Sequence, residues 1–369
     1  MYAFLSHSSA CDALRTLGSS VRNLPAWPAE PRELPIHRNT VTTQRMFQDY
    51  AKTVDLASYG AARQPVDLLV CSAKHRSRGK LAQFHAWKHA VPAGAMLRLE
   101  ETLFVSTPEF VLLQMAGYHT RQNTTNKVFS RELNEAREVY ARAGIEGEVP
   151  YDDPFAWEKY RQIVRMALVA SEFMGTYRLA GFGGETQYGL APVMTSEHVE
   201  QLMAGVTRVY GRGRIRRAME LAFANSASPM ETALALMLCS PEEYGGYGLP
   251  RPELNRSVPV SGHQLLWSGG PSITPDLLWE TWKVVIEYDS DENHGSLGPR
   301  KLASDATRAN VLTSLGYRVL RVTTLNIQQL DEMDRLARQV AAAIGAPFVE
   351  PDEVLRIRRR KLHELLMGQ

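Results

Sequence analysis

Acidic residues in the last third of the chain have a spacing that suits metal-dependent chemistry. Asp276 follows a proline, and Glu287 stands eleven residues later, directly after the apolar run Val284-Val285-Ile286. Two adjacent strands of a hairpin would bring the two carboxylates side by side. Together with Asp289 they form a hard oxygen site typical of Mg²⁺ or Mn²⁺. Such a metal activates water and neutralises charge on a scissile phosphate. The alternative is an ordinary hairpin with solvated acids at its ends.

The elements around these acids alternate between helix and strand. Ser228-Pro229-Met230-Glu231 predicts a helix start with a proline at the first helical position, and the helix runs to about Cys239. Apolar runs, turn formers and helical spacing predict the remaining elements. They are strands near 263–267, 275–279 and 283–289, a helix over 299–315, a strand over 317–323 and a helix over 327–344. The order is α-β-β-β-α-β-α.

This region resembles the PD-(D/E)xK nuclease superfamily. More narrowly, it resembles a domain family of unknown function that is related to the very-short-patch-repair endonucleases. The matching stretches, in order, are SPMETALALML (228–238), PDLLW (275–279), KVVIEYDSDENH (283–294) and SDATRANVLTSLGYRVLRVT (304–323). The resemblance covers about the last third of the chain. It implies a restriction-endonuclease-like α-β-β-β-α-β core and a Mg²⁺-dependent endonuclease or nickase that acts on DNA.

The resemblance also implies roles for individual residues. Asp276 and Glu287 would bind the metal, and Glu231 would be the helix-borne acid that completes or orients the site. Glu231 has an equally good second explanation, because Ser228 and Glu231 together form a capping box. One side chain can serve both purposes.

The chain departs from the superfamily motif two residues after Glu287. The motif has a lysine there, which orients the attacking water and stabilises the transition state, whereas this chain has Asp289. The resemblance makes Asp289 a third metal ligand and His294 a general acid or base, the alternative for His294 being an ordinary loop histidine. Lys301 or Arg308 on the following helix would replace the missing cation. Arg308 could equally form an ion pair with Asp305 on the helix surface.

Composition and charge restrict the other possibilities. The 369 residues are 44% hydrophobic and 22% charged, as in an ordinary globular protein. No apolar run reaches the length of a membrane span and no signal peptide starts the chain, so we expect a cytoplasmic protein without a membrane partner. The three cysteines Cys11, Cys71 and Cys239 form no CxxC pair, which favours a reducing compartment.

The charge is distributed unevenly. Residues 228–369 hold 15 Lys and Arg against 18 Asp and Glu, a balance of −3, whereas residues 1–227 carry +5. We therefore expect most of the electrostatic contact with nucleic acid to come from the N-terminal part. The candidate phosphate-binding residues are Lys74, Arg76, Arg78 and Lys80 in one cluster and Arg212 and Arg214 in another, beside Lys301 and Arg308. Either cluster could instead be an ordinary solvated surface.

Four segments are expected along the chain. Residues 1–150 form a mixed α/β domain, with strands at 64–71 and 95–107 and a helix that begins at Pro108, and serve as a possible recognition module. Residues 151–227 form a helical middle segment, 228–346 the nuclease-like domain and 347–369 a basic amphipathic tail, whose leucines suggest that it docks on the body. The stretch around 65–118 faintly resembles the N-terminal region of bacterial proteins that join such a nuclease domain to an abortive-infection antitoxin-like module.

Two functions from different classes follow. The first is a metal-dependent DNA endonuclease or nickase in repair or defence, with an RNA-directed nuclease sharing the same site. The alternative is a catalytically degenerate DNA-binding or antitoxin-like regulator that uses the nuclease fold as a scaffold. The Glu-x-Asp sequence at 287–289 keeps the alternative open. DNA or RNA specificity and oligomeric state do not follow from the sequence.

Overall fold

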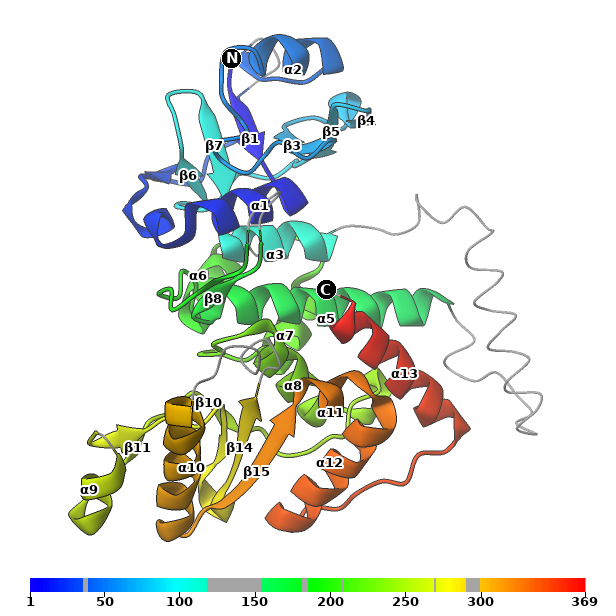
Figure 1. Cartoon of the computed structure of the whole chain (residues 1–369). Helices are drawn as coiled ribbons and strands as arrows, with labels where there is room; N and C mark the ends of the chain where they lie inside the picture. Colours follow the sequence, from blue (N-terminus) through cyan, green and yellow to red (C-terminus); the bar gives the residue numbers. More distant parts are fainter. Residues whose placement is uncertain are drawn as a thin grey trace. The chain divides into compact units, whose positions relative to one another are not determined.

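The fold is mixed α/β and comprises two compact units. A computed structural model describes residues 1–35, 39–117, 154–180, 185–206, 209–268, 270–289 and 299–368, without the side chains of 154–159, 267 and 299–305 (Figure 1). The first unit comprises Met1–Thr120 and Gln162–Ala222, and the second comprises Arg121–Arg161 and Phe223–Gln369. Residues 162–222 of the helical middle segment therefore belong to the same unit as the N-terminal α/β segment.

The first unit contains a seven-stranded mixed sheet in the order β2-β6-β7-β1-β3-β5-β4. Its strands are β1 (Ala3–Leu5), β2 (Ala26–Trp27), β3 (Val66–Val70), β4 (Ser77–Arg78), β5 (Ala82–Ala86), β6 (Met96–Arg98) and β7 (Leu103–Ser106). The strand predicted at 64–71 is confirmed as β3, which is buried along its whole length. The region predicted as strand at 95–107 is the antiparallel hairpin β6–β7.

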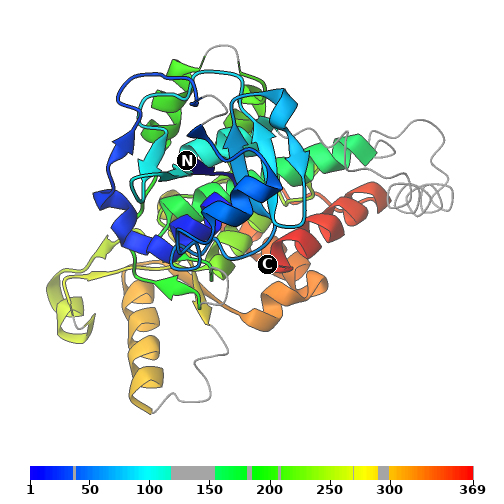
Figure 2. The ribbon, with the colours of Figure 1, turned by 90° about the horizontal axis from the view of Figure 1, so that it is seen from above.

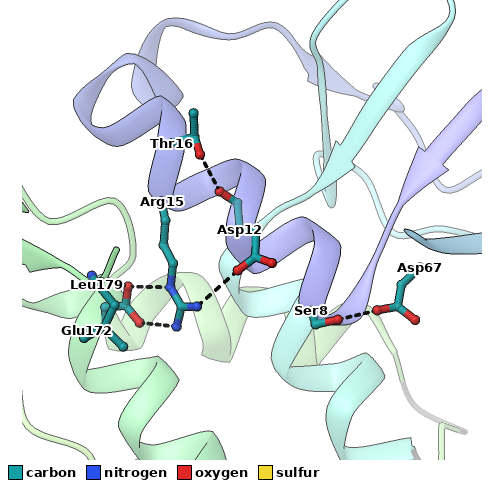
Figure 3. Close-up of polar contacts among 7 residues, drawn as sticks. All are labelled: Ser8, Asp12, Arg15, Thr16, Asp67, Glu172 and Leu179. Carbon is teal, nitrogen blue, oxygen red and sulfur yellow. Dashed lines mark hydrogen bonds and ion pairs between the residues drawn. The ribbon is translucent and has the colours of Figure 1, made fainter. Parts of the chain in front are cut away.

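Helices and a small hairpin complete the first unit. They are α1 (His7–Leu17), α2 (Gln44–Tyr50), α3 (Pro108–Gly117), most of α5 (Pro154–Met174), α6 (Ser196–Gly205) and α7 (Arg212–Leu221), with β8 (Tyr177–Arg178) paired to β9 (Gln187–Tyr188). Helix α1 packs on α3 and against β3 and β7. The side chain of Arg15 on α1 donates two hydrogen bonds to the buried Glu172 carboxylate on α5, at 2.9 and 2.8 Å (Figure 3).

The second unit is built on a four-stranded sheet in the order β10-β13-β14-β15. The strands are β10 (Glu253–Leu254), β13 (Leu277–Trp279), β14 (Val284–Asp289) and β15 (Arg318–Thr323). The first three pair antiparallel, and β15 runs parallel to β14. The parallel crossover contains α10 (Pro299–Ser314), whose Val311 and Leu312 pack in one core cluster with sheet residues Leu278 and Val285. The strands predicted at 275–279 and 283–289 are confirmed.

The strand predicted at 263–267 is wrong. This segment forms a short helical tip, Gly262–Gln264 and α9 (Leu265–Ser268), between the paired strands β11 (Val258–Pro259) and β12 (Ser272–Ile273). Gly262 has a φ of +64°, which turns the chain directly before the residue at which the predicted strand would begin. The helix α9 lies beside α10 in both views (Figures 1 and 2). Its apolar residues therefore serve a local turn and not a sheet.

The predicted helices of the second unit are present. Helix α8 (Pro229–Cys239) begins at the predicted cap, where the Ser228 hydroxyl accepts a hydrogen bond from the Glu231 amide. The helix predicted over 327–344 is divided into α11 (Thr324–Gln328) and α12 (Leu330–Ile344), because Gln329 adopts an extended conformation. Within the described residues, no helix is both long and apolar enough for a membrane span.

The basic tail docks on its own unit, as its apolar residues predict. Helix α13 (Glu353–Met367) packs on α8 and on the short helix η5 (Glu242–Tyr244), and buries leucines 355, 362 and 366. Arg359 is only 2% exposed; it donates a 2.7 Å hydrogen bond to Asp334 and lies 4.0 Å from the centre of the Tyr247 ring. Arg359 therefore contributes its charge to contacts within the unit and is not available to bind a phosphate.

Candidate functional site

The hairpin of β13 and β14 brings Asp276 and Glu287 together. Leu277 pairs with Ile286 in this antiparallel ladder, so the next position of the ladder sets Asp276 opposite Glu287. The amide of Tyr288 donates a 2.5 Å hydrogen bond to Asp276 Oδ2, which fixes the carboxyl group against the emerging strand. The apolar residues before Glu287 are fully buried, whereas Glu287 itself is partly exposed. The predicted juxtaposition of the two acids is confirmed.

Glu231 is the third acid of this site. It lies in the first turn of α8 and is 6% exposed, with its Oε2 accepting hydrogen bonds from the Ala227 amide at 2.9 Å and from the Asn255 side chain at 2.6 Å. Its own amide donates to the Ser228 hydroxyl at 3.1 Å. Its charge also acts on Asp276. Glu231 thus both caps the start of α8 and lies close enough to Asp276 for its charge to act on that carboxyl group.

Two arginines, Arg308 and Arg321, lie close to the carboxyl groups of Glu287 and Asp289. Arg308 on α10 lies 3.3 and 3.2 Å from the two oxygens of Glu287 and donates a 2.9 Å hydrogen bond to the Thr274 carbonyl. Asp289, whose side chain is 34% exposed, lies on the same side of β14 as Glu287 and 4.0 Å from Arg321 on β15. The described contacts of Arg308 are thus with the site, through Glu287 and Thr274.

Burial and the proximity of other carboxyl groups alter the pKa values of the three acids Asp276, Glu231 and Glu287. Burial, with the neighbouring Glu231 second, raises the pKa of Asp276 to about 8. Burial also raises the pKa of Glu231. It raises the pKa of Glu287 as well, although Arg308 opposes this. At neutral pH the group therefore retains a proton that a cation could displace.

The other predicted site residues lie partly outside the described chain. His294 is outside the described residues, and Lys301 is described only as part of the backbone of α10. Within the residues that are described, no three His, Cys, Asp or Glu side chains are arranged to hold a metal by themselves. Any cation at Asp276 and Glu287 would complete its coordination with water, backbone oxygens or substrate phosphate, as Mg²⁺ commonly does.

The two predicted basic clusters differ in their surroundings. Lys74, Arg76, Arg78 and Lys80 are all exposed, around the edge strand β4 of the first sheet. In contrast, Arg212 donates to the carbonyls of Met203 and Val206 at the end of α6. Arg214 donates to the Ala116 carbonyl at 2.9 Å, near the end of α3. Phosphate binding remains a prediction for both clusters; all four residues of the first are exposed, whereas Arg212 and Arg214 are partly buried.

A second polar cluster, which we did not predict, lies in the first unit. The buried Asp67 carboxylate accepts hydrogen bonds from the Ser8 hydroxyl (Figure 3) and from His85 Nε2 at 2.7 Å. The His85 ring stacks on His7, with centroids 3.8 Å apart and planes 23° apart. His7 has a φ of +48°, which is unusual for a residue other than glycine. The only local sign of this cluster in the sequence is the polar run Ser6-His7-Ser8-Ser9, which directly follows the strand β1.

This cluster predicts a pH-dependent loss of stability. Burial, followed by the charge of His85, lowers the pKa of His7 to about 3, whereas an unfolded histidine titrates near 6.5. The unfolded chain therefore binds more protons between these values, and stability falls as the pH drops below about 6.5. Because His7 is partly exposed, we expect His7→Asn to remove about 1–2 kcal/mol of the decrease between pH 7 and 4.5.

The measurement is urea unfolding at pH 4.5 and 7. Asparagine tolerates a positive φ, so the backbone conformation is retained. His263→Asn, at an exposed position in the short helix Gly262–Gln264, is the control and should show the pH dependence of the wild type. Equal pH dependence in wild type and His7→Asn would refute the assignment.

Comparison with protein-family models, with curated proteins and with solved structures gave no match. The side chains of the site and the resemblance of residues 228–323 to the PD-(D/E)xK superfamily are therefore the basis for proposing a function.

Proposed function

We propose that this protein is a metal-dependent nuclease that hydrolyses phosphodiester bonds, with DNA as its substrate. The observation that carries the proposal is the position of Asp276 opposite Glu287 on adjacent strands, within electrostatic range of Glu231. A carboxyl group whose pKa is raised by burial and by a neighbouring acid, as that of Asp276 is, is typical of a functional site. Mg²⁺ or Mn²⁺ is the cofactor that such a set of oxygens suits best.

The chain order of the second unit supports a restriction-endonuclease-like core. Helix α8 is followed by β10, β13 and β14, then by α10 and the parallel strand β15, which is the order α-β-β-β-α-β. In this arrangement the acids lie where β14 leaves the buried part of the sheet and at the start of β13. The short pair β11–β12 is an insertion between β10 and β13.

Asp276 and Glu287 would hold the metal, and partly exposed Asp289 is available as a further oxygen ligand. When bound, the metal would supply charge neutralisation and an activated water for attack on phosphorus. Arg308 would take the place of the lysine that the motif lacks, because its guanidinium already lies against Glu287. It would exchange part of that contact for a phosphate oxygen of the substrate, to which its planar donors are well matched.

Binding of the DNA backbone is assigned to the basic cluster around β4. Its four exposed cations, residues 74, 76, 78 and 80, lie at an edge of the first sheet and would contact phosphates without reading sequence. Such contacts predict an affinity that falls with increasing salt.

The test is cleavage of supercoiled plasmid and of single-stranded DNA by the full chain with Mg²⁺ or Mn²⁺. We expect nicks or breaks that require the metal, and a loss of at least about a hundredfold in Glu287→Gln, because removal of one electrostatic contribution to a transition state has this size. Single-stranded RNA in parallel reactions separates the DNA and RNA versions. Cleavage that persists in EDTA would contradict the proposal.

The alternative is a DNA-binding regulator with a degenerate nuclease fold. The ion pair between Arg308 and Glu287 favours it, because a protein cation already compensates one of the acids. DNA binding without cleavage, equal in wild type and Glu287→Gln, would establish this alternative.

A further inference from the structure

We infer that Asn255 is a positioning residue, which holds the Glu231 carboxylate beside Asp276. This inference rests on the proposed nuclease function. Asn255 directly follows β10 and joins three segments that meet at the acids: the turn at 225–227, the start of α8 and the start of β13. The sequence motifs that indicate the acids do not include it.

The contacts of Asn255 divide between its side chain and its backbone. The side-chain amide donates to Glu231 Oε2 at 2.6 Å and to the Asn225 carbonyl at 2.9 Å. The backbone amide donates to the Asp276 carbonyl at 3.0 Å. One residue therefore holds an oxygen of the first acid and the backbone of the second. A change in its side chain would alter the orientation of Glu231 and leave the backbone of Asp276 in place.

The Glu231 oxygen has a second donor, the Ala227 amide at 2.9 Å. Two donors on one oxygen restrict rotation of the carboxyl group, since both bonds have to be kept. Asn255 has a φ of +50°, a conformation that asparagine, aspartate and glycine tolerate best. In this backbone conformation the Asn255 side chain reaches Glu231 at the start of α8.

Supporting groups of this kind act by fixing the orientation of a ligand or catalytic acid. Their replacement commonly costs tenfold to a hundredfold in metal affinity or activity. For Asn255 we expect a lower kcat with little change in the KM for DNA, because its side chain contacts Glu231 and the Asn225 carbonyl and is not part of the basic cluster to which DNA binding is assigned.

Two substitutions separate positioning from simple support of the turn. Asn255→Gly retains the positive φ and the backbone hydrogen bond to Asp276 but removes the amide. Asn255→Asp retains the size and conformation but replaces the donor with a carboxylate beside Glu231. The control is Glu253→Gln, which removes an exposed acid two residues away whose ion pair is with Arg256. Far-UV circular dichroism establishes that each full-length variant is folded, and the Asp variant suffices if the Gly variant does not fold.

The two readouts are Mn²⁺ binding to the full chain, followed by electron paramagnetic resonance without DNA, and kcat and KM for plasmid cleavage. We expect Mn²⁺ affinity to fall about tenfold in Asn255→Gly and kcat to fall about tenfold to a hundredfold in both variants, with Glu253→Gln at the wild-type level. Wild-type binding and cleavage in both Asn255 variants would overturn the positioning role alone. A wild-type chain that neither binds Mn²⁺ nor cleaves would overturn the nuclease proposal and this role with it.

Discussion

Asp276→Asn is expected to abolish cleavage and at the same time to stabilise the folded protein at alkaline pH. For cleavage we expect a loss of at least about a thousandfold, because the substitution removes a charged ligand of the metal at the reacting centre. Asparagine has nearly the same shape, and its oxygen can still accept the hydrogen bond from the Tyr288 amide. The two effects therefore have one cause, the loss of a buried negative charge.

The gain in stability follows from the pKa of Asp276. The folded-state pKa is about 8, raised by burial and then by Glu231, against 3.8 for the ordinary group. The folded chain therefore binds more protons than the unfolded chain between these values, and its stability falls as the pH rises across this window. In the variant this decrease is absent. We expect the free energy of unfolding of Asp276→Asn to exceed that of wild type by about 2–3 kcal/mol at pH 9 and by less at pH 6.

Urea unfolding at pH 6 and 9 without divalent metal measures this difference. Glu253→Gln is the matched control, because it removes an exposed carboxylate of the same unit and should alter neither stability nor its pH dependence by more than a few tenths of a kcal/mol. Wild-type stability in Asp276→Asn at both pH values would mean that the carboxyl group is solvated. Full cleavage by the variant would remove Asp276 from the proposed site.

The pairing of Asp276 with Glu287 could be predicted because it depends on local sequence. An apolar run that ends in an acid defines the strand β14, and a proline and a short apolar run define β13, so that only the register is left to be fixed. The cap of α8 is equally local. In contrast, Asn255 became visible only in three dimensions, because the residues that it contacts are 21 to 30 positions away in the chain.

The wrongly predicted strand at 263–267 and the unforeseen burial of basic residues also have physical causes. Leu265, Leu266 and Trp267 are apolar, as the residues of a strand often are, but Gly262 turns the chain before them and the short helix α9 packs beside α10. Arg214 and Arg359 are ordinary basic residues in the sequence, whereas in the fold one donates to a backbone carbonyl and the other is buried against Asp334. Composition gives the number of cations, but only packing determines which remain available to a phosphate.

Gly245→Ala is expected to release helix α13 from its unit. Gly245 follows η5 with a φ of +93°, and a Cβ at this position would lie 2.2 Å from the Arg358 carbonyl oxygen and 2.8 Å from the Arg359 amide. Both neighbours are backbone atoms of α13, so relief requires the whole helix to move. The unfavourable φ and the overlap together predict a loss of about 3–5 kcal/mol.

Gly248→Ala separates the two contributions. Gly248 has a φ of +63°, but a Cβ there meets nothing within 4 Å, so this variant should lose only about 1–2 kcal/mol for the backbone conformation. Trypsin provides the direct readout, because α13 contains five basic residues over 356–361 that docking on α8 and η5 protects. We expect rapid cleavage there in Gly245→Ala and slow cleavage in Gly248→Ala and wild type. Equal protection in all three proteins would contradict the close packing of α13 on Gly245. It would also make the tail a candidate site for phosphate, because an Arg359 that is not held against Asp334 is a cation available to a substrate.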